Sequence, residues 1–300
     1  MNSLAADFQT INEALAQAIA RHANDNCPPT IPPPALSLVP SSDQVKLIHG
    51  CGLEMMRSMP SESVDLALCD LPYGMTRTKF DPIINVDEHM YELHRIVTHR
   101  GAVVAFSAQP FTNDLINASR AFDVKKEMFF KQEIIWEKDG TTGFSQARAR
   151  HLKAHENILV FSKGVVIGGA RTKRAMTYNP QGAFEVDAIL PSRGGFNYLG
   201  NTQRNQGGKH FKRLTNCPRS VLRFAKEKGK HIHPFAKPVP LLEYLINTFS
   251  NAGEVVLDPT AGSGSAAVAA INTGRKFIGA EIDRAFHDIA EKRIMEARMT

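Results

Sequence analysis

Short apolar runs alternate with segments of helical spacing along most of the chain, and this alternation limits its possible folds more than any other feature. Strands are predicted where apolar residues cluster, at 45–50, 64–69, 101–107, 129–138, 157–163, 254–258 and 276–281. Helices are predicted at 87–98, 111–120, 239–250, 264–272 and from residue 284 onward. Apolar strands separated by helices are typical of a parallel sheet that helices cover on both faces. We therefore expect a doubly wound, mostly parallel α/β fold.

Two stretches interrupt this alternation. Residues 1–26 have helical spacing and residues 27–40 are rich in proline, so residues 1–44 are predicted to form a helix and a linker. This extension could dock, dimerise or be a dispensable tail. From 163 to 230 the periodicity is lost, yet a structureless loop of that length is improbable in a compact domain. We expect an inserted, substrate-facing subdomain there, between the two domain parts 45–162 and 231–300.

The positive charge of the chain is concentrated in this insert. Residues 163–230 carry 14 Lys and Arg against three acids, whereas the whole chain has a net charge of +6, so the remainder is net negative. Such a distribution is typical of a surface that binds a polyanion. A solvated charged face, or a surface that binds RNA or a protein partner, is the alternative.

Composition excludes several other classes of protein. The chain is 43% hydrophobic and 22% charged, no apolar run reaches the length of a membrane span, and the N-terminus lacks the features of a secretory signal. The cysteines show no C-x-x-C pair and no metal-ligand spacing, and they are Cys27, Cys51, Cys69 and Cys217. We expect reduced, buried thiols in a cytoplasmic protein, and no metal site.

The first informative motif is Asp-Leu-Pro-Tyr-Gly at 70–74, which follows a predicted strand. A carboxylate at the end of a buried strand must contact a group that repays its desolvation. Pro72 stiffens the turn, and Gly74 permits an unusual backbone conformation. The motif predicts a rigid hook that presents a carboxylate, backbone carbonyls and an aromatic ring. Taken alone, Asp70 could equally be a helix cap or turn former, and Tyr73 a packing ring.

The second motif is a strand that ends at Asp258 and enters a glycine turn and a helix of small residues. This arrangement builds a cofactor crevice in α/β sheets, where Gly262 and Gly264 let the backbone approach a ligand and Glu281 could accept ribose hydroxyls. The glycines also fit a dinucleotide pattern. Asp258 would repel a pyrophosphate, however, and suits S-adenosylmethionine, which is positively charged and has no phosphate. An ordinary glycine turn with a solvated Asp258 is the remaining alternative.

Together the two motifs resemble the β-class DNA amino-methyltransferases, which methylate N6 of adenine or N4 of cytosine. In that family a D-P-P-Y motif, a target-recognition region and an S-adenosylmethionine motif follow one another in the order found here. The segment at 233–246 is similar to the family's H-P-x-x-K-P element, and 136–144 and 155–164 also resemble family segments. The resemblance covers residues 45–297 and implies a Rossmann-like methyltransferase sheet with an inserted target-recognition region.

This resemblance implies roles for individual residues. The Asp70 carboxylate and the Leu71 carbonyl would hold the target amine, Pro72 would stiffen the turn, and Tyr73 would stack on the base. Leu71 replaces the usual proline but keeps the carbonyl, so activity should survive. The residues implied to bind the cofactor are Asp70, Lys237, Asp258, Pro259, Gly262, Gly264 and Glu281. The candidate DNA contacts are Arg171, Arg174, Arg193, Arg204, Lys209, Lys212 and Arg213. Trp136 is expected to pack in the core, and Phe144 is expected to pack in a loop.

We therefore expect an S-adenosylmethionine-dependent N6-adenine methyltransferase of bacterial or phage DNA modification. It would act on a base extruded from double-stranded DNA, because the amine cannot be reached inside the stack. Asp70 favours adenine, since the family's cytosine members more often begin the motif with Ser. Two alternative functions remain, an N4-cytosine methyltransferase and a catalytically silent nucleic-acid-binding relative. A homodimer and a partnership with a cognate restriction enzyme are also open.

Overall fold

The computed structural model describes residues 45–76, 78, 80–120, 129–166, 173–189, 210–227 and 236–299. These residues divide into two compact units, a small one at Asn179–Arg219 and a larger one made of the rest. The predicted helix and linker at 1–44 lie outside the described residues. The larger unit thus includes 163–166, 173–178 and 220–227, so the small unit is shorter than the stretch of irregular sequence.

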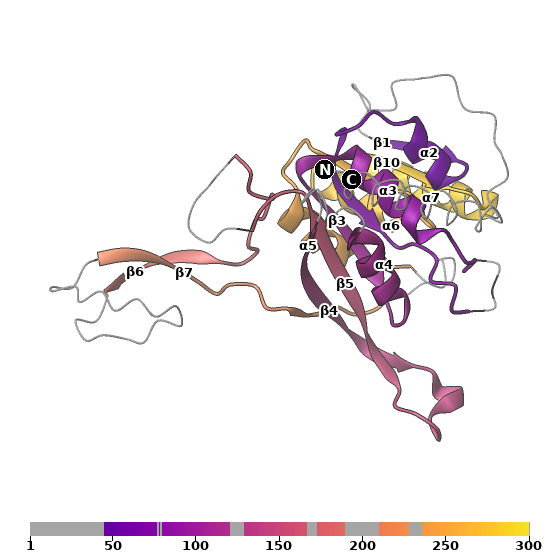
Figure 1. The fold of residues 1–300 in the computed structure, drawn as a ribbon, viewed down its shortest axis with the longest axis horizontal. Coiled ribbons are helices and arrows are strands. Elements are labelled where there is room, and N and C mark those ends of the chain that lie inside the picture. Colours follow the sequence, from indigo (N-terminus) through magenta and orange to yellow (C-terminus); the bar gives the residue numbers. More distant parts are fainter. Residues whose placement is uncertain are drawn as a thin grey trace, which may run out of the picture. The chain divides into compact units, whose positions relative to one another are not determined.

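Within the described residues, the larger unit is built on an eight-stranded sheet of order β1-β10-β9-β2-β3-β5-β4-β8 (Figure 1). Its strands are β1 (Val45–His49), β2 (Val64–Cys69), β3 (Val97–Ser107), β4 (Phe129–Thr142), β5 (Lys153–Ser162), β8 (Val221–Arg223), β9 (Val255–Asp258) and β10 (Lys276–Glu281). All neighbours from β1 to β3 pair in parallel, whereas β5 runs antiparallel to both β3 and β4. The predicted mostly parallel sheet is confirmed, with an antiparallel pair near one edge.

Helices cover both faces of this sheet, as predicted for a doubly wound fold. They are α2 (Gly52–Ser58), α3 (Val86–Ile96), α4 (Phe111–Arg120), α5 (Val239–Phe249), α6 (Ser265–Asn272) and α7 (Arg284–Arg298). Ala67 and Cys69 of β2 pack in one core with α2, α3 and α4, while Leu66 and Leu68 pack in the other with α5, α6 and α7. Helix α2 is not predicted from the sequence, because seven residues are too few to show a periodicity.

The strand order brings the two motifs to one edge of the sheet. Strand β2 pairs in parallel with β9, with Leu66 opposite Val256 and Ala67 opposite Leu257. Asp70, just after β2, and Asp258, the last residue of β9, therefore emerge on neighbouring strands at their carboxyl ends. Ligands of open α/β sheets bind at this edge.

The small unit contains an antiparallel pair of strands, β6 (Phe184–Ile189) and β7 (His210–Thr215). Lys212 and Arg213 lie on β7 and are exposed. The ammonium of Lys212 lies 3.6 Å from a carboxylate oxygen of Glu185 on β6. Part of the positive charge of this unit is thus paired across its own two strands.

Two predictions made from composition can be compared with the structure. Cys69 is a buried free thiol and Cys217 an exposed one, whereas Cys51 is disulfide-bonded, so the prediction of reduced, buried thiols is wrong in part. The prediction was wrong in part because the spacing of cysteines along the chain does not tell which of them are buried or bonded. Within the described part of the chain, every helix is too short or too polar to cross a bilayer.

The glycine turn before α6 is also a packing contact. Gly264 has a φ of +80°, and a Cβ at this position would lie 2.9 Å from the Cβ of Ala290 on α7. A side chain would therefore be strained by the backbone and would collide with a neighbouring helix. Gly274, which follows α6, has a φ of +70° but no atom within 4 Å of such a Cβ.

We expect Gly264→Ala to destabilise the protein more than Gly274→Ala. Both substitutions carry the left-handed backbone cost of about 1–2 kcal/mol. Only the first adds overpacking, worth about 1–3 kcal/mol. Urea unfolding of the two variants and the parent measures the difference. Equal losses would show that α7 moves aside freely and that Gly264 is required by its dihedral angle alone.

Candidate active site

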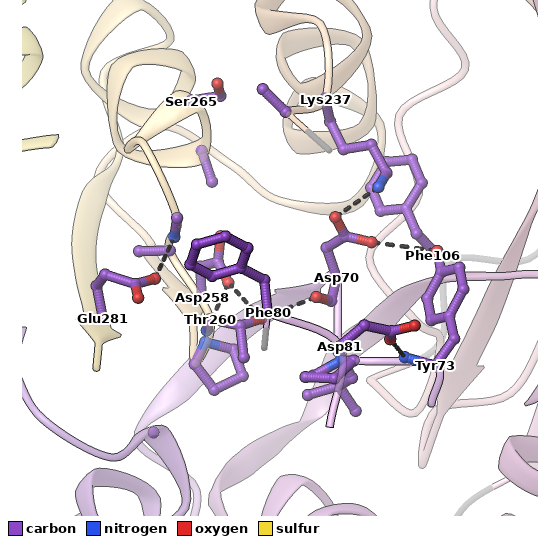
Figure 2. Close-up of a pocket in the computed structure, with 18 of the residues that line it drawn as sticks. Asp70, Tyr73, Phe80, Asp81, Phe106, Lys237, Asp258, Thr260, Ser265 and Glu281 are labelled. Carbon is purple, nitrogen blue, oxygen red and sulfur yellow. Dashed lines mark hydrogen bonds and ion pairs between the residues drawn. The ribbon is translucent and has the colours of Figure 1, made fainter. Parts of the chain in front are cut away.

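One cavity of about 930 Å³ lies at the carboxyl ends of β2, β9 and β10. Most of the residues predicted for catalysis and cofactor binding line it, namely Asp70, Leu71, Pro72, Tyr73, Lys237, Asp258, Pro259, Gly262 and Glu281. Figure 2 shows Asp70 pointing toward Lys237, with Asp258 and Glu281 on the other side of the cavity. Gly264 does not line this cavity and instead packs against α7.

Both carboxylate oxygens of Asp70 are engaged. The Tyr73 hydroxyl donates to Oδ1 at 3.1 Å, and the Lys237 ammonium donates to Oδ2 at 2.5 Å. Burial raises the pKa of Asp70, although Lys237 opposes this shift. The carboxylate is therefore held in one orientation and is a better proton acceptor than an ordinary aspartate.

The backbone of the hook is held by Asp81, a residue that the sequence did not nominate. Its carboxylate accepts hydrogen bonds at 2.6–2.9 Å from four successive backbone N–H groups, those of Tyr73, Gly74, Met75 and Thr76. Burial opposes ionisation of Asp81, but these bonds outweigh it and lower its pKa. Gly74 has a φ of +65°, the permissive conformation predicted for it. The one feature of the sequence that could have identified Asp81 is its position shortly after a turn that contains glycine.

The ring of Tyr73 is packed on one side. It stacks on Phe111 of α4 with ring centres 5.1 Å apart and planes inclined by 23°. Its hydroxyl reaches Asp70, as described above. The residue therefore contributes a hydrogen-bond donor to the site as well as an aromatic surface, and only the surface was predicted.

Lys237 lies buried between two carboxylates. Its ammonium contacts Asp70 and lies 3.5 Å from Oε2 of Glu156 on β5, and it also lies 5.0 Å from the centre of the Phe106 ring. Burial opposes its charge, but Asp70 and Glu156 outweigh this effect and raise its pKa. Glu156 in turn pairs with Lys138 of β4. Lys237, predicted as a cofactor ligand, thus orients Asp70 in the structure.

Asp258 is a buried acid of the cavity whose ionisation is opposed by its surroundings. Its side chain is buried, and Oδ1 accepts a hydrogen bond from the backbone N–H of Thr260 at 3.0 Å. Burial, with smaller contributions from the Asp70 and Glu281 charges, raises its pKa to about 7. The cavity therefore contains an acid that a positively charged ligand would stabilise in its ionised form.

Glu281 is fixed at the end of β10 by two backbone donors. Oε2 accepts from Gly262 and Oε1 from Asp283, both at 2.8 Å. Burial raises the pKa of this carboxylate. Each oxygen keeps a second lone pair, so a ligand hydroxyl can still donate to it.

The glycine turn is held from behind by Arg293 of α7. The guanidinium donates to the carbonyl of Ser263 at 2.9 Å and to the hydroxyls of Ser263 and Ser265 at 3.1 Å. It also pairs with Glu227 at 2.8 Å. This arginine was missed, because its position in a polar helix pattern looks like that of an ordinary surface residue.

Three of the seven predicted DNA contacts lie within the described residues. Arg174 is exposed in the larger unit, and Lys212 and Arg213 lie in the small unit. The other four, Arg171, Arg193, Arg204 and Lys209, lie outside the described residues. Their role in DNA binding stays a prediction.

Trp136 and Phe144 differ in burial. Trp136 is buried against Phe106, and its indole N–H donates to the carbonyl of Phe224 at 2.9 Å. Phe144 is 69% exposed, so the expectation that it packs in a loop is wrong. It lies on a short 3₁₀ turn (Phe144–Gln146) that connects β4 to β5, and its neighbours in this connection are exposed as well.

A group of potential metal ligands among the described residues lies on α7. One ligand atom from each of His287, Asp288 and Glu291 lies within 4.8 Å of the others. Asp288 and Glu291 are exposed, and none of the three lines the cavity. This group is separate from the residues described above.

Known proteins resemble the chain over most of its length. A family model of N6/N4 methyltransferases, described as DNA methylase, matches residues 64–292. The DNA adenine methyltransferase YhdJ of Escherichia coli is 30% identical over 268 residues, which cover 83% of this chain and 82% of the relative. The Type II methyltransferase M.BglII of Bacillus subtilis is 26% identical over 287 residues, with coverages of 89% and 72%.

Solved structures share the fold. The PvuII DNA methyltransferase (cytosine-N4-specific) superposes with a TM-score of 0.60 at 15% identity, covering 84% of this chain and 87% of its own. The complex of M1.HpyAVI with S-adenosylmethionine has a TM-score of 0.54 at 18% identity, with coverages of 83% and 98%.

We expect Asp81→Asn to destabilise the protein by about 1–3 kcal/mol, because an amide cannot accept all four backbone donors. Since the pKa of Asp81 is lowered by folding, its contribution is complete above its ordinary value of 3.8 and is lost as pH falls below it. The difference between variant and parent should therefore shrink in acid. Denaturant unfolding at pH 7 and pH 3 measures it.

Asp139→Asn is the control, because one backbone bond to Asp139, from Lys226, is seen. Equal effects of the two substitutions would contradict the role of Asp81.

Proposed function

Because the chain belongs to the N6/N4 DNA methylase family, whose members use S-adenosylmethionine, we propose that it methylates N6 of adenine in double-stranded DNA. One observation carries the proposal: Asp70, which heads the hook, shares a single cavity with Asp258 and Glu281. The hook is suited to an exocyclic amine, and the other two acids to the cofactor. Asp70 in place of Ser, together with the similarity to a DNA adenine methyltransferase, favours adenine over cytosine.

The chemistry of the cavity fits S-adenosylmethionine. Asp258 is a buried carboxylate with a raised pKa, and it gains most from a cationic group and nothing from a phosphate. Glu281 is held by backbone donors with lone pairs remaining for ribose hydroxyls. When bound, S-adenosylmethionine supplies a methyl group on a positively charged sulfur, which makes that carbon electrophilic.

The hook would activate the amine by holding its hydrogens. The amine of adenine is a weak nucleophile because its lone pair is delocalised into the ring. The Asp70 Oδ1, where the Tyr73 hydroxyl now donates, and the Leu71 carbonyl would each accept one amine hydrogen and localise that lone pair. Lys237 keeps Oδ2 in place. The rate would come from positioning and oriented charges, and the raised pKa of Asp70 suits it to take up the released proton.

N4-cytosine methylation is the second candidate. The matched family model covers both N6 and N4 enzymes, and two acceptors on a rigid turn can hold the exocyclic amine of either base. The two functions differ in the product that they leave in DNA.

Product analysis tests this assignment. Duplex DNA incubated with the protein and isotopically labelled S-adenosylmethionine should yield labelled N6-methyladenine after digestion to nucleosides and mass analysis. Asp70→Ala should abolish the label while leaving cofactor affinity within a few-fold of the parent. Label found solely in N4-methylcytosine would establish the second candidate instead. In a parallel incubation with RNA, labelling of the RNA without labelling of the DNA would contradict both.

We also expect cofactor affinity to rise with pH up to about 7, the pKa of Asp258. Its pKa is raised by burial, so the acid is largely neutral below this value, and a cationic ligand must then displace a proton to bind. Below the pKa the affinity should fall by up to about tenfold per pH unit. Calorimetric titration of S-adenosylmethionine between pH 5.5 and 7.5 measures this slope. Asp258→Asn should bind weakly and with a flat profile, and a parent profile that is equally flat would remove Asp258 from cofactor binding.

A further inference from the structure

A second, smaller cavity adjoins the catalytic one. Its volume is about 320 Å³, and Met75, Thr142 and Lys153 line both cavities. Its walls come from the end of β4, the connection from β4 to β5, the start of β5 and the residues after β3. The two cavities are therefore neighbours that share part of their walls.

The two cavities differ in the charge of their lining residues. The side chains of the smaller one that carry or can acquire positive charge are Arg150, His151, Lys153 and His155, and no Asp or Glu is among its described lining residues. We call these four residues the cationic pocket. The catalytic cavity is lined by seven acids and four lysines, namely Asp70, Asp81, Glu156, Glu227, Asp258, Glu281 and Asp283, and Lys138, Lys153, Lys226 and Lys237. Among the described lining residues, the smaller cavity thus has basic side chains and no acid, whereas acids outnumber lysines in the larger one.

Several positive charges lie close to one another at the cationic pocket. The pKa of Lys153 is lowered by burial and by the nearby charges of Lys138, Lys237 and Arg150, while Glu156 acts in the opposite direction. An anion placed here would relieve this repulsion. The arginine adds a planar donor group that suits phosphate oxygens.

The surrounding segment is accessible to a large ligand. Residues 143–151 are exposed throughout, and Figure 1 shows β4 and β5 extending beyond the rest of the sheet toward this connection. Between residues 141 and 155 there are three Lys and Arg, two His and no acid. This run was not singled out in the sequence, because it is short and lies between two strands rather than in the long basic insert.

We propose that the cationic pocket binds the backbone phosphate of the nucleotide whose base enters the catalytic cavity. A nucleotide joins a neutral base to an anionic phosphate across one sugar, and a large cavity next to a smaller one with basic side chains and no acid among its described lining residues matches that arrangement. Such a contact positions the strand without reading its sequence. The inference rests on the proposed function in that the base must leave the duplex to be methylated.

The test pairs a protein variant with a DNA modification. Arg150→Gln/Lys153→Gln removes two pocket charges. Arg148→Gln is the matched control, because Arg148 is an exposed arginine of the same connection that does not line the pocket. The DNA is a duplex containing the site that sequencing of DNA methylated by the protein identifies, with or without a neutral methylphosphonate at the phosphate next to the target base. Affinity is measured by fluorescence anisotropy over a range of salt concentrations.

We expect the double variant to lose affinity on the order of tenfold for the unmodified duplex, as for lost charged hydrogen bonds. Its salt dependence should flatten by about one unit of slope, as for one phosphate contact. The methylphosphonate should weaken the parent and Arg148→Gln by a similar factor but leave the double variant almost unchanged, because both changes remove the same contact. Additive losses in the double variant would overturn the proposal.

Two further measurements separate this inference from the proposed function. Thermal unfolding and S-adenosylmethionine affinity should match the parent in both variants, which shows that the fold and the cofactor site are intact. If the parent methylates adenine in DNA but the losses are additive, the pocket assignment alone fails. A loss of affinity by the double variant for an RNA duplex but not for DNA would also overturn it. Absence of any methylation of DNA by the parent contradicts the proposed function itself.

Discussion

The parallel pairing of β2 with β9 is the contact on which the rest of the site depends. These strands are far apart in the chain, yet their register places Asp70 and Asp258 at one edge of the sheet. The hydroxyl of Thr260 then donates to the backbone carbonyl of Asp70 at 3.1 Å, across 190 positions of sequence. A shift of one residue in this register would turn the alternate side chains of β2 from one core to the other, so the apolar pattern that folds the sheet also fixes the geometry of the cavity.

The acids of the cavity occupy different electrostatic environments. Asp70 is already balanced by Lys237 and oriented by Tyr73, while burial dominates at Asp258 and keeps it near half-ionised at neutral pH. One carboxylate is thus arranged in advance, and the other depends on the charge of a ligand. Residues of the same type acquire different chemistry from what surrounds them.

The fold and the residues of the two motifs could be predicted from the sequence because each is a local pattern. Apolar periodicity located seven of the ten described strands, all but β6, β7 and β8, and every described α-helix except α2. The turn residues after two strands located Asp70 and Asp258. The supporting groups could not be found in this way. Asp81 acts on the backbone of a preceding turn, Arg293 reaches back from the last helix, and Glu156 becomes part of the site through Lys237. Each depends on a contact between segments that no local pattern records. The prediction for Phe144 was wrong because an aromatic residue suggests packing, whereas its side chain and those of the neighbouring residues in this connection are exposed.

Because Gly264 packs closely against Ala290, the two glycines of the turn after β9 indicate different properties of a sequence. Gly262 lines the cavity. Gly264 instead packs α6 against α7 and does not line the cavity. A descendant that lost the cofactor would be free to replace Gly262, yet it would still be selected to keep Gly264 in order to fold. Retention of the second glycine is therefore evidence of common architecture and not of activity, and surveys that search for active members of such a family should give weight to Asp258 and Gly262 instead.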